Sequence, residues 1–154
     1  MAQATYEQVN LMLKLYDMRR EPRLREARNW FFEHFQASSA EEMMQKYPPG
    51  SEESLNARMT VSYWDMVASI ANRGLMDDDL FFENTGEAWA VWERVKGLTP
   101  GWRAALKDPH IFSHLEELSK RFEAWRDRRA PGSTAAMRQM MEQMRRPAAK
   151  AAKE

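Results

Sequence analysis

Apolar residues recur at intervals of three and four along most of this chain. The first such stripe consists of Tyr6, Val9, Leu13 and Tyr16, and the second of Leu24, Ala27, Phe31 and Phe35. This spacing places apolar side chains on one face of an α-helix, and no stretch alternates as a β-strand would. The pattern predicts an all-α protein, a single-domain antiparallel helical bundle of about five principal helices plus short connecting helices.

Capping and breaking residues set the expected boundaries of these helices. Thr5 with Gln8 and Ser39 with Glu42 have the spacing of a capping box, and Gly74 suits a helix end. We expect principal helices at residues 5–20, 22–36, 51–73, 78–96 and 109–129, and short helices near 40–46 and 100–107.

Three consecutive aspartates, Asp77, Asp78 and Asp79, precede the fourth principal helix. Carboxylates in a first helical turn accept hydrogen bonds from free backbone N–H groups and oppose the positive end of the helix dipole. A calcium loop would need alternating oxygen ligands, whereas Leu80 and Phe81 occupy those positions. The aspartates are therefore expected to begin a helix.

The composition favours a globular protein of a reducing compartment. The chain has 154 residues, 44% of them hydrophobic, and no cysteine. Disulfides and thiolate metal sites are excluded. No run of eighteen apolar residues and no signal-peptide core are present, so we expect a soluble, cytoplasmic protein without membrane insertion.

The formal net charge is zero, but the charge is unevenly distributed. Residues 1–119 contain 13 Lys and Arg against 19 Asp and Glu, while residues 120–154 contain 10 against 4. We expect a helical bundle domain at 1–130 and a basic, Met- and Ala-rich C-terminal tail at 131–154, partly helical or disordered. Such asymmetry can mark a binding segment, or simply a solvated tail.

The tail contains the candidate partner-binding residues. Its methionines share one helical arc and its three arginines lie outside that arc, which makes the segment amphipathic. The candidate residues are Met137, Arg138, Met140, Met141, Met144, Arg145 and Arg146. The expected partner is a protein or another copy of the chain, and nucleic acid is an alternative.

The chain has no nucleophile elbow, phosphate-binding loop or dinucleotide fingerprint. This favours a non-enzymatic role, with no catalytic residue, no cofactor and no metal assigned. An alternative is a metal- or small-ligand-binding helical protein that uses His110, His114 and Glu117, whose spacings of four and three share one helical face, with His34 as a further candidate.

Five arginines lie within residues 17–28, DMRREPRLREAR. Asp17, Glu21 and Glu26 alternate with them at helical spacing. We therefore expect a solvated helix junction in which the arginines pair with these acidic neighbours.

Residues 56–95 resemble the middle of an uncharacterised bacterial family of helical domains, the domain of unknown function 4760 type. The matching turn comprises Arg73, Gly74, Leu75, Met76 and Asp77, and the Trp-rich segment after it contains Trp89 and Trp92. The helix at 20–35 is also similar, so the likeness spans roughly residues 5–125. The resemblance implies an all-helical fold and a bacterial source, and no established activity.

Together these patterns predict a non-enzymatic interaction or regulatory module that can self-associate. The basic tail or a groove between helices would hold a protein partner or another copy of the chain.

Overall fold

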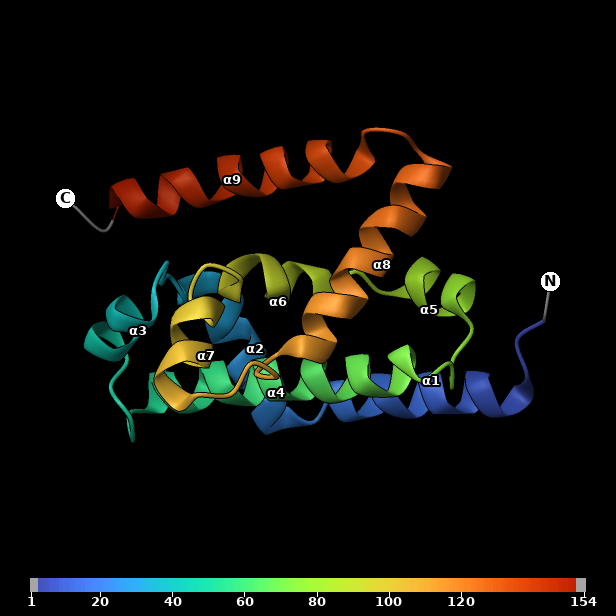
Figure 1. Cartoon of the computed structure of the whole chain (residues 1–154), viewed down its shortest axis with the longest axis horizontal. Helices are drawn as coiled ribbons and strands as arrows, with labels where there is room; N and C mark the ends of the chain where they lie inside the picture. Colours follow the sequence, from blue (N-terminus) through green and yellow to red (C-terminus); the bar gives the residue numbers. More distant parts are fainter. Residues whose placement is uncertain (1–2, 152–154) are drawn as a thin grey trace. The chain divides into compact units, whose positions relative to one another are not determined.

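A computed structural model gives the backbone of residues 3–151 and the side chains of residues 3–145. This described part is helical, with no β-strand, which confirms the predicted all-α class (Figure 1). Its helices are α1 (Tyr6–Arg19), α2 (Pro22–His34), α3 (Ala40–Lys46), α4 (Glu52–Asn72), α5 (Asp78–Asn84), α6 (Glu87–Val95), α7 (Thr99–Leu106), α8 (Ser113–Arg129) and α9 (Ser133–Ala151). Within these residues, no helix is both long and apolar enough to cross a membrane.

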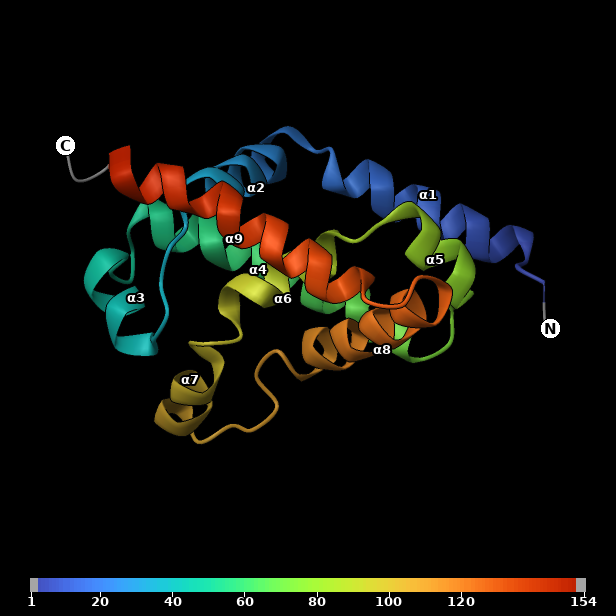
Figure 2. The same cartoon turned by 90° about the horizontal axis from the view of Figure 1, so that it is seen from above.

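The chain divides into two compact units, Met1–Ser119 and Lys120–Glu154. In the first unit α4 packs against α2 and α6, and α3 packs against α7. α1 and α4 run in opposite directions (Figures 1 and 2). The second unit holds the end of α8 followed by α9, and it coincides with the basic segment of the sequence.

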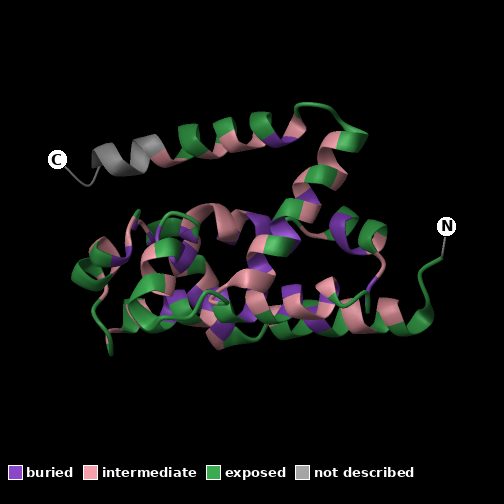
Figure 3. Ribbon diagram, in the orientation of Figure 1, coloured by how far each residue is buried: buried purple, intermediate pink, exposed green. Residues whose placement is uncertain are grey.

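The core of the first unit is rich in aromatic rings. Phe31 and Phe35 of the α2 region are 0% and 1% exposed, and their rings stack with centroids 4.8 Å apart. Val67 and Ala68 of α4 and Val91 of α6 are likewise buried. Figure 3 shows buried residues distributed over the central helices of this unit. Burying these side chains supplies the main driving force for the fold.

The predicted caps form as the sequence indicates. Thr5 and Gln8 make a reciprocal capping box on α1, and the Ser39 side chain accepts from the backbone N–H of Glu42. The Asp77 carboxylate accepts from the N–H of Leu80 at 2.9 Å, with Asp78 and Asp79 in the first turn of α5. The aspartates therefore begin a helix, as predicted.

The helix predicted at 78–96 is wrong as one element, because the chain breaks at Thr85 and Gly86. Thr85 is extended, with φ −153° and ψ 133°, and Gly86 is the N-cap of α6. A glycine inside a helix lowers the stability of that helix by about 1 kcal/mol relative to alanine. Gly86 therefore disfavours a continuous helix through this position. The break makes Glu87 the first residue of a new helix.

The last helix of the first unit begins at Ser113, and not at residue 109 as predicted. Asp108 accepts from the N–H of His110 at 2.9 Å and holds a turn. Phe112 then adopts a positive φ of 56°, which is incompatible with a helix continuing through it. His110 therefore lies in a turn before α8.

The apolar stripe predicted on α1 is not the face that the protein covers. Tyr6, Leu13 and Tyr16 are 89%, 52% and 48% exposed, and Leu15 is the buried residue of this helix. Apolar periodicity identifies a face, but whether a neighbouring helix covers that face depends on the tertiary packing.

Two glycines allow α3 and α7 to approach each other closely. A Cβ atom on Gly101 would lie 2.9 Å from the Cβ atom of Ala40, and one on Gly97 would lie 2.9 Å from the Ser38 carbonyl oxygen. The lack of a side chain at Gly97 and at Gly101 therefore permits the close approach of α3 and α7. A groove opens beside this helix pair.

Candidate functional site

A concentrated set of charged interactions in the first unit surrounds Glu87. Its carboxylate accepts from Arg28 Nε and Arg28 Nη2, both at 2.5 Å, from Arg19 Nη1 at 3.0 Å and from Trp64 Nε1 at 3.0 Å. The side chain of Glu87 is only 15% exposed. We refer to Glu87, Arg19, Arg28 and Trp64 as the Glu87 cluster.

The break between α5 and α6 places Glu87 at this position. As the first residue of α6, its carboxylate lies beside the positive end of the helix dipole. The Thr85 hydroxyl accepts from the backbone N–H of Glu87 at 3.4 Å, which fixes the start of the helix. Helices α1, α2 and α4 then each supply one donor residue to the same carboxylate, and Arg28 of α2 donates twice.

The cluster carries an excess of positive charge. Arg28 makes a bidentate pair with Glu87, and Arg19 adds a second guanidinium, so two cations face one carboxylate. The Nε atom of Arg19 is buried without a hydrogen-bond partner. The Tyr16 ring lies 4.9 Å from the Arg19 guanidinium carbon, within the range of a cation–π contact.

In the arginine-rich stretch at 17–28, the predicted local partners are wrong for Arg19 and Arg28. Arg19 and Arg28 pair with Glu87, which lies 68 and 59 residues away in the sequence. Within the stretch, Arg23 pairs with Glu26 at 3.8 Å. Nothing in the local spacing identifies Glu87 as the common partner, because the pairing depends on three helices meeting.

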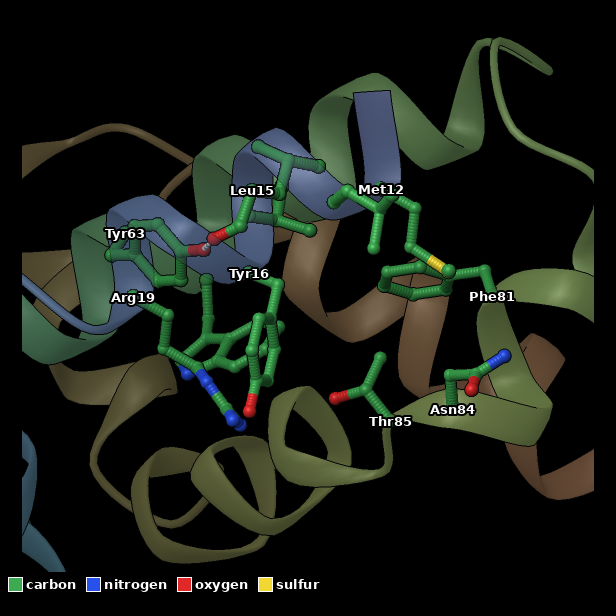
Figure 4. A pocket seen from close by; sticks show the side chains of 11 residues that line it. Met12, Leu15, Tyr16, Arg19, Tyr63, Phe81, Asn84 and Thr85 are labelled. Atoms are coloured by element: carbon green, nitrogen blue, oxygen red, sulfur yellow. Dashed lines mark hydrogen bonds between the residues drawn. The ribbon is translucent and has the colours of Figure 1, made fainter. Parts of the chain in front are cut away.

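An apolar cavity of about 230 Å³ lies beside the Glu87 cluster (Figure 4). Among the residues that the structure describes, Arg19 is the only charged one in its wall. The other lining residues come from α1, α4 and the α5–α6 break, and they are Met12, Leu13, Leu15, Tyr16, Tyr63, Trp64, Val67, Phe81, Asn84 and Thr85.

Tyr63 of α4 lines the cavity and is hydrogen-bonded to the backbone of α1. Its hydroxyl donates to the backbone carbonyl of Leu15, 48 residues away. Burial raises the pKa of Tyr63 to about 12, while the charge of nearby Arg19 opposes that rise. The phenol therefore stays protonated and acts as a hydrogen-bond donor at neutral pH.

A second, larger hollow of about 850 Å³ opens on the first unit, and we call it the α4–α7 groove. Its wall is mostly apolar and includes Leu55, Trp102 and Leu106, with Leu55 and Leu106 40% and 62% exposed. The charged residues in its wall are Arg23, Arg58 and Glu52. The groove shares no lining residue with the smaller cavity.

The alternative built on His110, His114 and Glu117 lacks its predicted geometry. His110 precedes α8, so the three residues do not share a helical face. His34 is exposed and lies 3.6 Å from Glu33, its neighbour in α2. Among the described residues, no three or more His, Asp or Glu side chains are grouped so that they could hold a metal.

The candidate tail residues lie on α9. Arg138 pairs with Glu123 of α8 at 2.7 Å, and Asp127 accepts from the N–H of Thr134 at 3.0 Å, so α9 is tied to α8 within the second unit. Met140 and Met144 are 49% and 69% exposed, whereas Met137, Met141 and Arg145 are partly buried. The side chain of Arg146 lies outside the described residues.

The family model described as Domain of unknown function (DUF4760) matches residues 4–125. This range includes the Glu87 cluster, the cavity and the α4–α7 groove, and it ends before α9. No curated protein and no solved structure matches the chain. Since the family model covers most of its length, the chain belongs to the DUF4760 family.

Proposed function

We propose that this chain is a non-enzymatic protein-interaction module whose α4–α7 groove binds an amphipathic helix of a partner protein. The observation that carries the proposal is the groove of about 850 Å³ with exposed leucines in its wall. An apolar helix face laid into a groove is a common mode of peptide recognition, and it uses side chains spaced three and four residues apart. Exposed apolar surface of this kind is typical of interaction sites.

The charge of the groove favours an acidic partner. Arg58 is exposed at its rim and the Arg23 side chain is 35% exposed, against the single acid Glu52. Carboxylates flanking the apolar face of the partner helix would complement these cations. The basic C-terminal segment of a second copy would not, because it carries the same sign of charge.

Site-specific photocrosslinking in the source cell tests this proposal. A benzoylphenylalanine at Leu106 reports on the groove, and one at Leu75 is the matched control, because Leu75 is a similarly exposed leucine that does not line the groove. We expect a protein crosslink from position 106 and none from 75, mapped to a helical segment with acidic residues. Adding Arg58→Glu should abolish that crosslink.

Three results would contradict the proposal. Equal crosslinking from both positions would show non-specific contact, and no crosslink from position 106 would leave the groove without a partner. A crosslink to another copy of this chain, unaffected by Arg58→Glu, would exclude the acidic partner and indicate self-association through the groove.

A second candidate function, self-association through α9, is supported by the exposed Met140 and Met144. A helix of this length with an apolar face gains stability when a second copy covers that face. Sedimentation of the full chain and of the Met140→Glu/Met144→Glu variant tests it. A dimer in the wild type that the variant loses is expected, and a monomeric wild type at high concentration would end this candidate.

A further inference from the structure

The cavity beside the Glu87 cluster combines an apolar wall with one cation, and the α4–α7 groove plays no part in it. Met12 and Leu15 of α1, Val67 of α4 and Phe81 of α5 supply apolar surface, and the last three are buried. We propose that this cavity binds a small organic carboxylate, with its apolar part between α1, α4 and α5 and its carboxylate on Arg19.

The charge balance of the wall favours an anion. Arg19 is the only charged residue lining the cavity in the described part of the chain, and Glu87 is already held by the bidentate pair with Arg28. Only one terminal nitrogen of Arg19 is bonded to Glu87, and its buried Nε has no partner. A ligand carboxylate would neutralise the remaining positive charge and accept from the guanidinium.

Neutral polar side chains also line the cavity near Arg19. Figure 4 shows the hydroxyl of Tyr16 beside the Arg19 guanidinium and the hydroxyl of Thr85 directed toward Tyr16. Both are hydroxyl groups that can donate to a carboxylate oxygen. The Arg19 side chain is 23% exposed, so a polar head beside it would keep access to water.

The size of the cavity limits the ligand. Its volume of about 230 Å³ is below the roughly 300–1,000 Å³ of sites for drug-sized ligands. A nucleotide is too large for this volume. A phosphate group would need more hydrogen-bond donors than one arginine and two hydroxyls. A carboxylate with a short aliphatic chain or a single ring suits both the volume and the single cation.

Titration of the ¹⁵N-labelled full chain with hexanoate, followed by NMR, tests this site. Hexanamide is the matched uncharged probe, because it keeps the chain length and removes the negative charge. We expect saturable shifts at the amides of Leu13, Asn84 and Thr85. Hexanamide should bind about ten-fold more weakly or worse, because a hydrogen bond to a charged group is stronger than one between neutral groups.

Two arginine variants separate a specific contact from general attraction. Arg19→Gln should weaken hexanoate about ten-fold or more and change hexanamide little. Arg20→Gln is the control, since the Arg20 guanidinium also lies over the Tyr16 ring, at 5.5 Å, but Arg20 does not line the cavity. It should leave both affinities unchanged.

Met12→Trp provides a second test that leaves the Glu87 cluster intact. The larger side chain should fill the cavity and abolish hexanoate binding while the circular-dichroism spectrum stays helical. The proposal would be overturned by equal binding of hexanoate and hexanamide, by equal losses in Arg19→Gln and Arg20→Gln, or by undiminished binding in a folded Met12→Trp variant. These results do not depend on the partner of the α4–α7 groove.

Discussion

Replacing Glu87 with glutamine is expected to destabilise the protein strongly. Glu87 accepts four hydrogen bonds from Arg19, Arg28 and Trp64, and its side chain is 15% exposed. Glutamine keeps the size of the side chain and one acceptor oxygen. It removes the negative charge and directs an NH₂ group at donors that need an acceptor.

The magnitude follows from the two partly buried guanidinium groups left without a counter-charge. Breaking a fully buried ion pair costs about 3–5 kcal/mol, and residual exposure together with the remaining amide oxygen lowers this to roughly 2–4 kcal/mol for Glu87→Gln. For a chain of this size, such a loss corresponds to a fall in Tm of roughly 5–15 °C.

Urea unfolding followed by circular dichroism measures this effect. Glu26→Gln is the control, because Glu26 also pairs with an arginine but its side chain is 75% exposed. The control should change the free energy of unfolding by less than about 0.5 kcal/mol. If Glu87→Gln were as mild as Glu26→Gln, the view that the Glu87 cluster fixes three helices to α6 would be refuted.

Three further predictions concern other parts of the first unit. Gly101→Ala should lower the free energy of unfolding by about 1–3 kcal/mol in urea melts, because the new Cβ atom would lie 2.9 Å from the Cβ atom of Ala40 in α3. An unchanged free energy of unfolding would show that α3 and α7 separate freely. Tyr63→Phe should cost about 1–2 kcal/mol, since it leaves the Leu15 carbonyl without its donor, and a variant as stable as the wild type would refute this. The hydrogen bond from Lys46, followed by bonds from a neighbouring serine, lowers the pKa of Glu42 from 4.5 to about 2. A carboxyl with a lowered folded-state pKa stabilises the fold above its unfolded pKa, and this contribution disappears as the pH falls from about 4.5 to about 2. Glu42→Gln should therefore lose less stability than the wild type across that pH range. Equal losses of stability in the two proteins would contradict the lowered pKa of Glu42.

The local sequence determined the helical elements and most of their ends. Thr5, Ser39 and Asp77 cap helices because a side-chain oxygen two or three residues from a free N–H reaches it in any surroundings. These interactions join residues close in sequence, so spacing alone identifies them. Sequence also identified the family, whose model matches residues 4–125.

Elements whose ends depend on distant residues were predicted less well. The expected helix at 78–96 ignored the break at Gly86, and the helix expected from 109 begins only after Phe112 takes a positive φ. In both places an apolar pattern continues through a residue whose backbone leaves the helix. Periodicity records which side chains are apolar and does not record where the backbone turns.

Only the tertiary structure decided which residues meet at the candidate sites. Arg19 and Arg28 each have an acidic residue two positions away in the sequence, yet both pair with Glu87, because α1, α2 and α4 converge on the start of α6. The cavity beside the Glu87 cluster and the α4–α7 groove arise in the same way, from helices that pack without filling the space between them. Helix formation follows from interactions within a few residues, whereas charge pairing and cavity shape depend on contacts between segments that are distant in the sequence.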